Sequence, residues 1–379
     1  MQTLSPTDKD YWKQIVASSN RLGLRLLPHL QGPNSNGNVV ISPTSIFVIL
    51  SMLYNGACGN TYVELNQALN LPTDKELNPW MRQLINFING HNQPDLDIQL
   101  VSALWFGAGE ALHFDFANAM TEIYSASLYS IDFTQPDAIA RINAWAGNAT
   151  RGNITELLDS LDSGTRFILT NAIYFLGKWV APFQASASRA TDFFIAGGGS
   201  KKVVSMSQTG PFSYYDDSEC QSIILPYAHG NYVMHIAIPR KVQSPNVLLP
   251  RLEELLAKTN SPSPSWVELT MPKFEMTFAT QLQQILGLIG IRDLCDRQRC
   301  DLGRIGSDLV VSKVIHKAII KVDELGTEAA GASAAMMMPA GGLGAPQTMT
   351  MTIDHPFVYS ICDKMTGQIL FAGIYNGPL

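Results

Sequence analysis

The stretch Glu324-Leu-Gly-Thr-Glu-Ala-Ala-Gly-Ala-Ser-Ala-Ala-Met-Met-Met-Pro-Ala340 decides the fold of this chain. It follows a β-branched run, Val314 to Val322, which predicts a buried strand, and strand pattern resumes only near Thr348. The connection between the two strands is therefore longer than twenty residues. Loops of that length inside a compact domain are usually functional or disordered.

Small side chains dominate the part of this stretch nearest the first strand. If it is written as a strand, Thr327, Ala329 and Gly331 share one face, and the charge of Glu328 falls on the other. One face could therefore enter a protein core without burying an ion, which would be very costly. Composition alone equally allows a flexible Ala/Gly linker, and alanine and methionine also favour helix, although Gly331 disfavours it.

Length and composition bound the class of protein. The 379 residues are 46% hydrophobic and 15% charged, which suffices for a large core and is unlike a disordered chain. No linker or internal repeat divides the chain, so we expect one domain, 1–379. The net charge of −6 argues against nucleic acid and against a basic membrane-binding surface. The longest apolar run, Ile46 to Tyr54, is too short to span a bilayer.

The cysteines do not form a disulfide framework, because they are odd in number and irregularly spaced: Cys58, Cys220, Cys295, Cys300 and Cys362. Cys295 and Cys300 are close enough in sequence to bridge locally, and the others are expected to be buried free thiols. The polar start of the chain carries no secretion signal.

Local patterns predict individual elements. Apolar residues at helical spacing predict a helix from Thr7 to Leu30 that is closed by Pro28. The segment from Gln99 to Gly107 predicts a strand, and the segment from Ala117 to Leu128 predicts a helix.

Motifs along the whole chain resemble one family. Glu-x-Gly-Thr-Glu-Ala-Ala-Gly-Ala, beginning at Glu324, resembles the reactive-loop hinge of the serpins, the serine-protease inhibitor family. Other segments are similar to serpin segments in the same order: Ile41 to Ile46, Gly56 to Thr61, Ile142 to Leu158, Leu169 to Trp179, Leu225-Pro226-Tyr227, Pro272-Lys273-Phe274, Pro356-Phe357-Val358 and Phe371-Ala372-Gly373. The resemblance implies an α+β architecture, the serpin fold. In it a large mixed β-sheet and smaller sheets are surrounded by about nine helices, with an exposed reactive loop at about 324–346.

The resemblance implies a suicide-substrate mechanism against serine proteases. A protease attacks the loop and forms an acyl-enzyme, the cleaved loop inserts into the main sheet between the strands of Asn171 and His316, and the covalent complex is trapped. The hinge that inserts first is made of Glu324, Gly326, Thr327, Glu328, Ala329, Ala330, Gly331 and Ala332.

The implied partner is the target serine protease, held covalently by a monomer that can also polymerise from loop to sheet. No cofactor, metal, nucleic acid or membrane is implied. We expect an extracellular or cell-envelope protein whose leader has been removed, or a cytoplasmic one.

The family's spacing places the reactive bond between Ala340 and Gly341, because Ala340 is the seventeenth residue counted from Glu324. The preceding residues would then contact the protease subsites and suit elastase-like or subtilisin-like enzymes: Met337, Met338 and Pro339. Leu343 is the alternative reactive residue, and it would imply a chymotrypsin-like target.

Four polar residues lie in otherwise apolar segments: Ser42, Ser45, Asn171 and His316. Each needs a partner, since an unpaired polar group there would cost about 1–3 kcal/mol. The resemblance implies one network beneath the opening of the main sheet, and the alternative is four independently satisfied groups. It also implies an ion pair between Lys273 and Glu324 at the top of the sheet, with Trp179 nearby. The alternative for Trp179 is an ordinary core tryptophan.

An enzyme is not indicated, because the seven histidines are scattered and no nucleophile, zinc or phosphate-loop motif is present. Two alternatives to a serine-protease inhibitor remain within the family. One is a non-inhibitory chaperone or carrier, whose hinge usually has bulky or charged residues. The other is an inhibitor of papain-like cysteine proteases.

Overall fold

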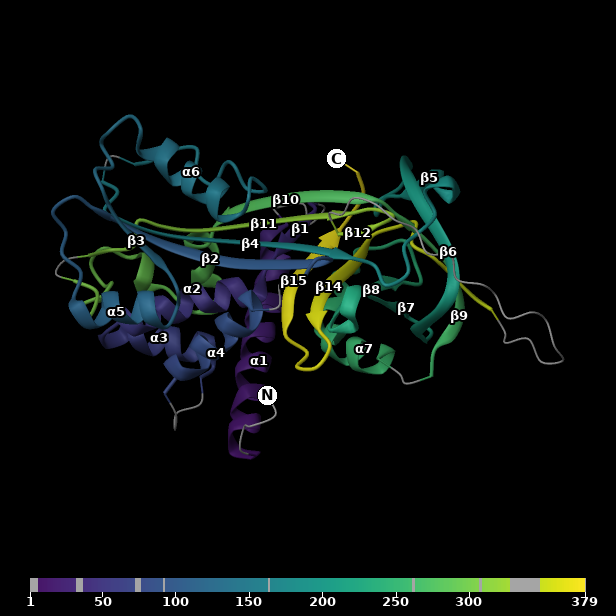
Figure 1. The fold of residues 1–379 in the computed structure, drawn as a ribbon, viewed down its shortest axis with the longest axis horizontal. Coiled ribbons are helices and arrows are strands. Elements are labelled where there is room, and N and C mark those ends of the chain that lie inside the picture. The colour runs from purple at the N-terminus through teal and green to yellow at the C-terminus, as the bar shows by residue number, and fades with distance from the viewer. Residues whose placement is uncertain are drawn as a thin grey trace.

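The computed structural model describes residues 6–31, 37–71, 76–90, 93–162, 164–260, 263–306, 309–327 and 348–378. Two β-sheets and a set of helices make up this part of the chain, which is the expected α+β architecture. Figure 1 shows α6 on one face of the long six-stranded sheet and α1 to α5 on the other.

The six-stranded sheet has the strand order β10-β11-β12-β4-β2-β3. Its strands are β2 (Leu96–Gly107), β3 (Ser127–Ile131), β4 (Phe167–Lys178), β10 (Phe274–Gln281), β11 (Lys313–Val322) and β12 (Gly326–Thr327). The pairs β2–β4 and β10–β11 are antiparallel, whereas β2–β3 and β4–β11 are parallel. The sheet is therefore mixed, and its central pair is parallel.

The nine-stranded sheet has the order β1-β15-β14-β8-β7-β6-β9-β13, with β5 paired to β6. Its strands are β1 (Val39–Ile41), β5 (Arg189–Phe194), β6 (Ser200–Asp216), β7 (Cys220–Pro226), β8 (Tyr232–Pro239), β9 (Ser265–Pro272), β13 (Met349–Thr352), β14 (Phe357–Asp363) and β15 (Ile369–Tyr375). Every residue of β8, β14 and β15 is buried, as expected for strands covered on both faces.

Seven helices of eight or more residues surround the sheets in the described part of the chain, and α8 adds a single turn. They are α1 (Pro6–Leu26), α2 (Pro43–Gly56), α3 (Gly59–Leu69), α4 (Asn78–Asn89), α5 (Phe114–Glu122), α6 (Ala138–Ala149), α7 (Leu252–Thr259) and α8 (Gln283–Leu286). Short 3-10 turns lie between them, namely η1 (Leu27–Leu30), η2 (Ala185–Ala187), η3 (Ala228–Gly230), η4 (Pro245–Arg251), η5 (Gly287–Ile289) and η6 (Asp293–Cys295).

Helix α2 is almost entirely buried beneath the six-stranded sheet. Its N-cap, Ser42, accepts a hydrogen bond from the backbone N–H of Ser45, and Pro43 occupies the first turn, where its missing N–H costs nothing. An all-round apolar helix of this kind is stable only inside a core.

Two predicted element boundaries were wrong. The helix expected from Ala117 to Leu128 ends at Glu122, because the chain turns at Ser125 (φ +51°) and residues from Ser127 onward pair with β2 as strand β3. The first helix ends at Leu26 rather than Leu30, and the chain continues as η1, with Pro28 in its first turn.

Candidate functional site

The start of the predicted hinge lies inside the six-stranded sheet. Gly326 and Thr327 form β12, which pairs with Lys178 and Gly177 of β4 on one side. On the other side Thr327 pairs with Val322 of β11. Gly326 and Thr327 of the predicted hinge therefore already occupy the place of a strand between β4 and β11.

The remaining loop residues that the sequence singled out lie outside the described residues, and their roles stay predictions. They are Glu328, Ala329, Ala330, Gly331, Ala332, Met337, Met338, Pro339, Ala340, Gly341 and Leu343.

Direct pairing between β4 and β11 covers only part of their length. The parallel register runs from Lys313 opposite Ile168 to Ala318 opposite Ile173. Beyond Ala318, β11 continues to Val322, and its next partner on this side is Thr327 of β12. We call this boundary between β4 and β11 the seam. Its lower part is the stretch 168–173 and 313–318, where the strands pair directly. Its upper end, at Lys178 and Val322, holds the hinge.

Two glycines make room for the hinge at the upper end. Gly326 has φ +153°, and a Cβ there would lie 2.1 Å from the carbonyl oxygen of Gly177. A Cβ on Gly177 would in turn lie 2.7 Å from the ring of Phe175 and 3.0 Å from that of Tyr227. Both positions therefore require glycine.

An ion pair fixes the chain at Glu324, just before β12. Lys273 Nζ lies 3.1 Å from both carboxylate oxygens of Glu324, and Ser188 Oγ donates to Oε1 at 2.6 Å. Burial alone would raise the pKa of Glu324, but the hydrogen bonds from Ser188 and Lys273 outweigh it and hold the pKa below its usual range. The carboxylate is therefore charged at neutral pH.

Trp179 anchors the same segment from β4's end. Its indole N–H donates to the carbonyl of Asp323 at 3.0 Å, and its backbone N–H donates to Leu325 at 2.9 Å. Its ring stacks on Tyr227 with centroids 4.5 Å apart. Trp179 is thus both a core residue and a direct partner of the hinge segment.

The structure brings the four predicted network residues together at the lower part of the seam. The backbone N–H of Ser42 donates to His316 Nε2 at 3.0 Å, and Ser45 Oγ donates to Asn171 Oδ1. Asn171 and His316 are opposite one another in the β4–β11 register. All four are fully buried, and the chain of contacts links α2 to both strands of the seam.

His316 is neutral in this environment. Burial lowers its pKa to about 3, and Nε2 accepts the bond from Ser42, so the proton is on Nδ1. Nδ1 is buried and has no hydrogen-bond partner among the described residues.

Sequence reasoning missed three residues that complete these contacts: Ser102, Ser188 and Tyr227. Ser102 Oγ accepts from Asn171 Nδ2 at 3.0 Å, and Tyr227 shares a hydrogen bond with Thr327. Ser102 gave a usable signal, since it is a polar residue within an apolar strand pattern. Ser188 and Tyr227 gave none, because their partners come from distant segments of the chain.

A segment after α6 crosses the face of the sheet over the seam. Residues 151–162, which we call the strap, begin at Arg151, whose guanidinium pairs with Asp97 of β2. Further along, Lys317 Nζ of β11 donates to the carbonyl of Glu156, and Lys313 Nζ donates to that of Ser160 at 3.2 Å. The strap is therefore tied on both sides of the seam.

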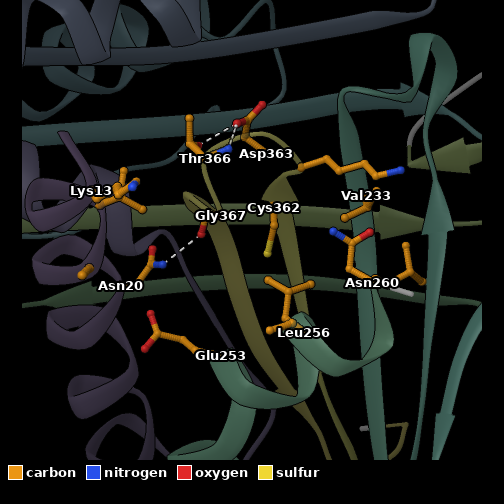
Figure 2. Close-up of a pocket in the computed structure, with 15 residues that line it drawn as sticks. Lys13, Asn20, Val233, Glu253, Leu256, Asn260, Cys362, Asp363, Thr366 and Gly367 are labelled. Carbon is orange, nitrogen blue, oxygen red and sulfur yellow. Dashed lines mark hydrogen bonds between the residues drawn. The ribbon is translucent and has the colours of Figure 1, made fainter. Parts of the chain in front are cut away.

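A separate cavity of about 300 Å³ lies away from the hinge, between α1, α7 and strands β7, β8 and β14. Figure 2 shows Val233 and Leu256 in its lining together with Lys13 and Glu253. Asn20 Nδ2 of α1 donates to the carbonyl of Gly367 at 2.9 Å at its edge. The cavity combines apolar walls with charged groups.

A family model described as "Serpin (serine protease inhibitor)" matches residues 17–378. The chain belongs to the serpin family. One relative of this serpin is the leukocyte elastase inhibitor of Equus caballus, which is 32% identical over 97% of this chain and 100% of its own length.

Solved serpins share the fold of this serpin. The native state of the thermophilic serpin tengpin superimposes with a TM-score of 0.86 at 23% identity, covering 98% of this chain and 95% of tengpin. Thyroxine-binding globulin in complex with thyroxine gives a TM-score of 0.85 at 25% identity and covers 96% and 99% of the two chains. The predicted fold class is confirmed.

Among the described residues, no cluster of three or more histidine, cysteine, aspartate or glutamate side chains could hold a metal ion. No described helix is long and apolar enough to cross a membrane. Cys220 and Cys362 are buried free thiols, as expected, whereas the expectation was wrong for Cys58, whose thiol is free but partly exposed. The side chain of Cys295 lies outside the described residues, so the structure does not test whether it forms the local bridge to Cys300 that the spacing allows.

Proposed function

We propose that this serpin inhibits serine proteases as a suicide substrate. The observation that carries the proposal is the position of β12, since Gly326 and Thr327 already pair with β4 and Thr327 also pairs with β11. A loop cleaved beyond this point can extend β12 downward along the seam. The small residues that follow Thr327 in the sequence suit insertion, since only small side chains pass easily into a packed sheet.

Insertion of the loop would release free energy. About a dozen inserted residues would add ladder hydrogen bonds worth roughly 0.5–1.5 kcal/mol each, on the order of 10 kcal/mol in sum. The β4–β11 ladder from Lys313 to Ala318 would have to be exchanged for pairing with the new strand. The gain therefore has to exceed the cost of parting the lower seam and its buried network.

Trapping of the protease would follow from distortion of its active site. Loss of a single oxyanion-hole donor slows acyl-enzyme chemistry by roughly 100- to 1,000-fold. Insertion has to finish before deacylation, which in ordinary turnover takes place on the order of 10 times per second. The pre-docked hinge supports this scheme, because the first step of insertion is already complete.

An elastase-like or subtilisin-like protease is the proposed target, with Ala340–Gly341 as the reactive bond. The small apolar residue Ala340 supports this choice. So does the relative named leukocyte elastase inhibitor, which is 32% identical. Cleavage after Leu343 would instead indicate a chymotrypsin-like target, and a stable complex with a papain-like enzyme would indicate the cysteine-protease alternative.

A carrier role is the second candidate. The cavity between α1 and α7 favours it, because apolar walls with a charged rim suit an amphipathic small molecule. Thyroxine-binding globulin, a structural neighbour, is solved with thyroxine. Both functions are compatible in one chain, since the cavity and the hinge are lined by different residues.

The experiment that tests the proposed inhibition is a titration against elastase, subtilisin, chymotrypsin and papain. We expect a complex that survives boiling in detergent with elastase or subtilisin, at close to one inhibitor per protease. Mass spectrometry of the released C-terminal peptide then locates the cleaved bond. Complete cleavage of the loop with no complex for any enzyme would contradict the proposal and favour the carrier role.

A further inference from the structure

Tyr227 approaches the hinge from outside the six-stranded sheet. It follows β7 and is fixed by its backbone, since its N–H donates to the carbonyl of Tyr232 at 3.0 Å and it forms a bridge with Trp179. Its ring is stacked on Trp179 and packs edge-on against Phe175 at 4.7 Å. The ring is fully buried, so its hydroxyl points to one place only.

That hydroxyl meets the hinge. Tyr227 Oη and Thr327 Oγ1 are 2.7 Å apart, and both residues are completely buried. Burial raises the pKa of Tyr227 well above its usual value, so the phenol is neutral and shares one hydrogen bond with the threonine hydroxyl. If the hinge left the sheet or shifted, the phenol would lose this partner inside an apolar core, which is unfavourable.

Only one register of the hinge satisfies the phenol. The neighbours of Thr327 in the sequence are Leu325, Gly326, Glu328 and Ala329, and none of them has a hydroxyl. The carboxylate of Glu328 could accept from the phenol only if its charge were buried, which would be very costly. A slip by one residue would also move the inward side chains to the other face of the sheet.

We propose that Tyr227 is a positioning residue that selects Thr327 as the first inward residue and so sets the register in which the loop enters the sheet. The Tyr227 ring packs against Trp179 and Phe175 and lies next to Gly177, and it presents its hydroxyl to one small hydroxyl side chain. We call this arrangement the socket. The role of this socket in protease trapping rests on the proposed inhibitory function, but the docking itself does not.

Hydrogen–deuterium exchange of the intact, uncleaved chain tests the docking without any protease. In Tyr227→Phe we expect amides of 322–327 and of Trp179 to exchange roughly 5- to 150-fold faster, the range for one buried partner left unpaired. Thr327→Val should have the same effect, and Thr327→Ser should exchange like the wild type. The double variant should exchange no faster than either single variant, because replacing both partners with apolar groups leaves no unpaired hydroxyl.

Tyr124→Phe is the matched control. Tyr124 is also a buried phenol with hydrogen-bond partners, Asn55 and Asn78, but these lie on helices α2 and α4. This variant should lose stability without faster exchange at the hinge. Hinge exchange in Tyr227→Phe within twofold of the wild type, or effects that simply multiply in the double variant, would overturn the inference.

Inhibition provides the second readout. In Tyr227→Phe the number of inhibitor molecules consumed per trapped elastase should rise, while the rate of loop attack stays the same. Thr327→Ser alone, which keeps the hydroxyl, should retain the wild-type number. If the wild type traps no protease, the proposed function fails. The exchange experiment still decides on the socket.

Discussion

The two ends of the seam between β4 and β11 are built differently. At the lower end the strands pair directly over 313–318 and 168–173, and a fully buried network joins them to α2. At the upper end β12 lies between the two strands, and the ion pair of Lys273 and Glu324 is partly exposed. Opening the lower end breaks buried hydrogen bonds, whereas the upper end already holds an inserted segment.

This difference implies a direction for loop insertion. The hinge starts at the end where no β4–β11 ladder has to be broken, and each further residue then meets the parallel ladder and finally the network. The strap lies over the same boundary and is tied to β2 by Arg151 and to β11 by Lys317. Under the proposed inhibition, we therefore expect the stability of the intact chain to depend mainly on the lower end and the start of loop insertion to depend mainly on the upper end.

The largest expected effect is at Thr327. Thr327→Arg would place a charge where the wild-type side chain is fully buried against Tyr227, so the hinge could not dock and insertion would stall. We expect complete conversion from inhibitor to substrate, measured as loss of detergent-stable complex with elastase or subtilisin. Thr327→Ser is the control, and full-yield complexes from the arginine variant would show that the hinge is assigned to the wrong residues.

The next effect concerns the lower end. Asn171→Ala would leave the hydroxyls of Ser45 and Ser102 without their shared partner, at about 1–3 kcal/mol for each unpaired group. We expect a lower melting temperature and faster polymerisation on warming. Ser51→Ala is the control, since its buried hydroxyl bonds only within α2, to Phe47. Equal behaviour of the two variants would mean that the network has no special part in closing the seam.

A pH effect follows from the buried histidines. Burial lowers the pKa of His235 and of His316 to about 3, so both are neutral when folded and take up protons near pH 6.5 when unfolded. Their contribution to stability is complete above pH 6.5 and is lost as the pH falls toward 3, with on the order of 2 kcal/mol lost per histidine at pH 5.

Denaturant unfolding at pH 7.5 and pH 5 measures this loss. His316→Gln keeps an acceptor for the N–H of Ser42, and it should show a smaller drop between the two pH values than the wild type. An identical drop in both proteins would mean that His316 does not titrate between the folded and unfolded states.

The smallest effect is expected for the ion pair at the upper end. The Lys273 side chain is 36% exposed and Ser188 also bonds Glu324, so Lys273→Ala should cost only about 0–1 kcal/mol. Thermal melts at low and high salt would measure it, with the difference from wild type shrinking at high salt. Lys13→Ala, which removes a largely exposed pair with Asp10, is the control. A loss of several kcal/mol for Lys273→Ala would mean that the upper end is held more tightly than its contacts indicate.

Sequence reasoning reached the fold through the motifs but reached the site only in part. Ser42, Ser45, Asn171 and His316 stood out because polar residues within apolar runs need partners, and the structure places them in contact. Tyr227 was quoted within a motif without a role, because its partner Thr327 is 100 residues away and nothing local links them. The turn at Ser125 was missed because the apolar spacing up to Leu128 fits a helix as well as a short strand.

Cleavage of the loop is the most direct test of the central claim, that the intact chain has a place between β4 and β11 for its own loop. A catalytic amount of thermolysin would nick the loop, and calorimetry would compare the cut and intact proteins. An added strand worth on the order of 10 kcal/mol should raise the melting temperature by roughly 10 °C or more in a chain of 379 residues. A cut protein that unfolds at the same temperature as the intact one would contradict the account.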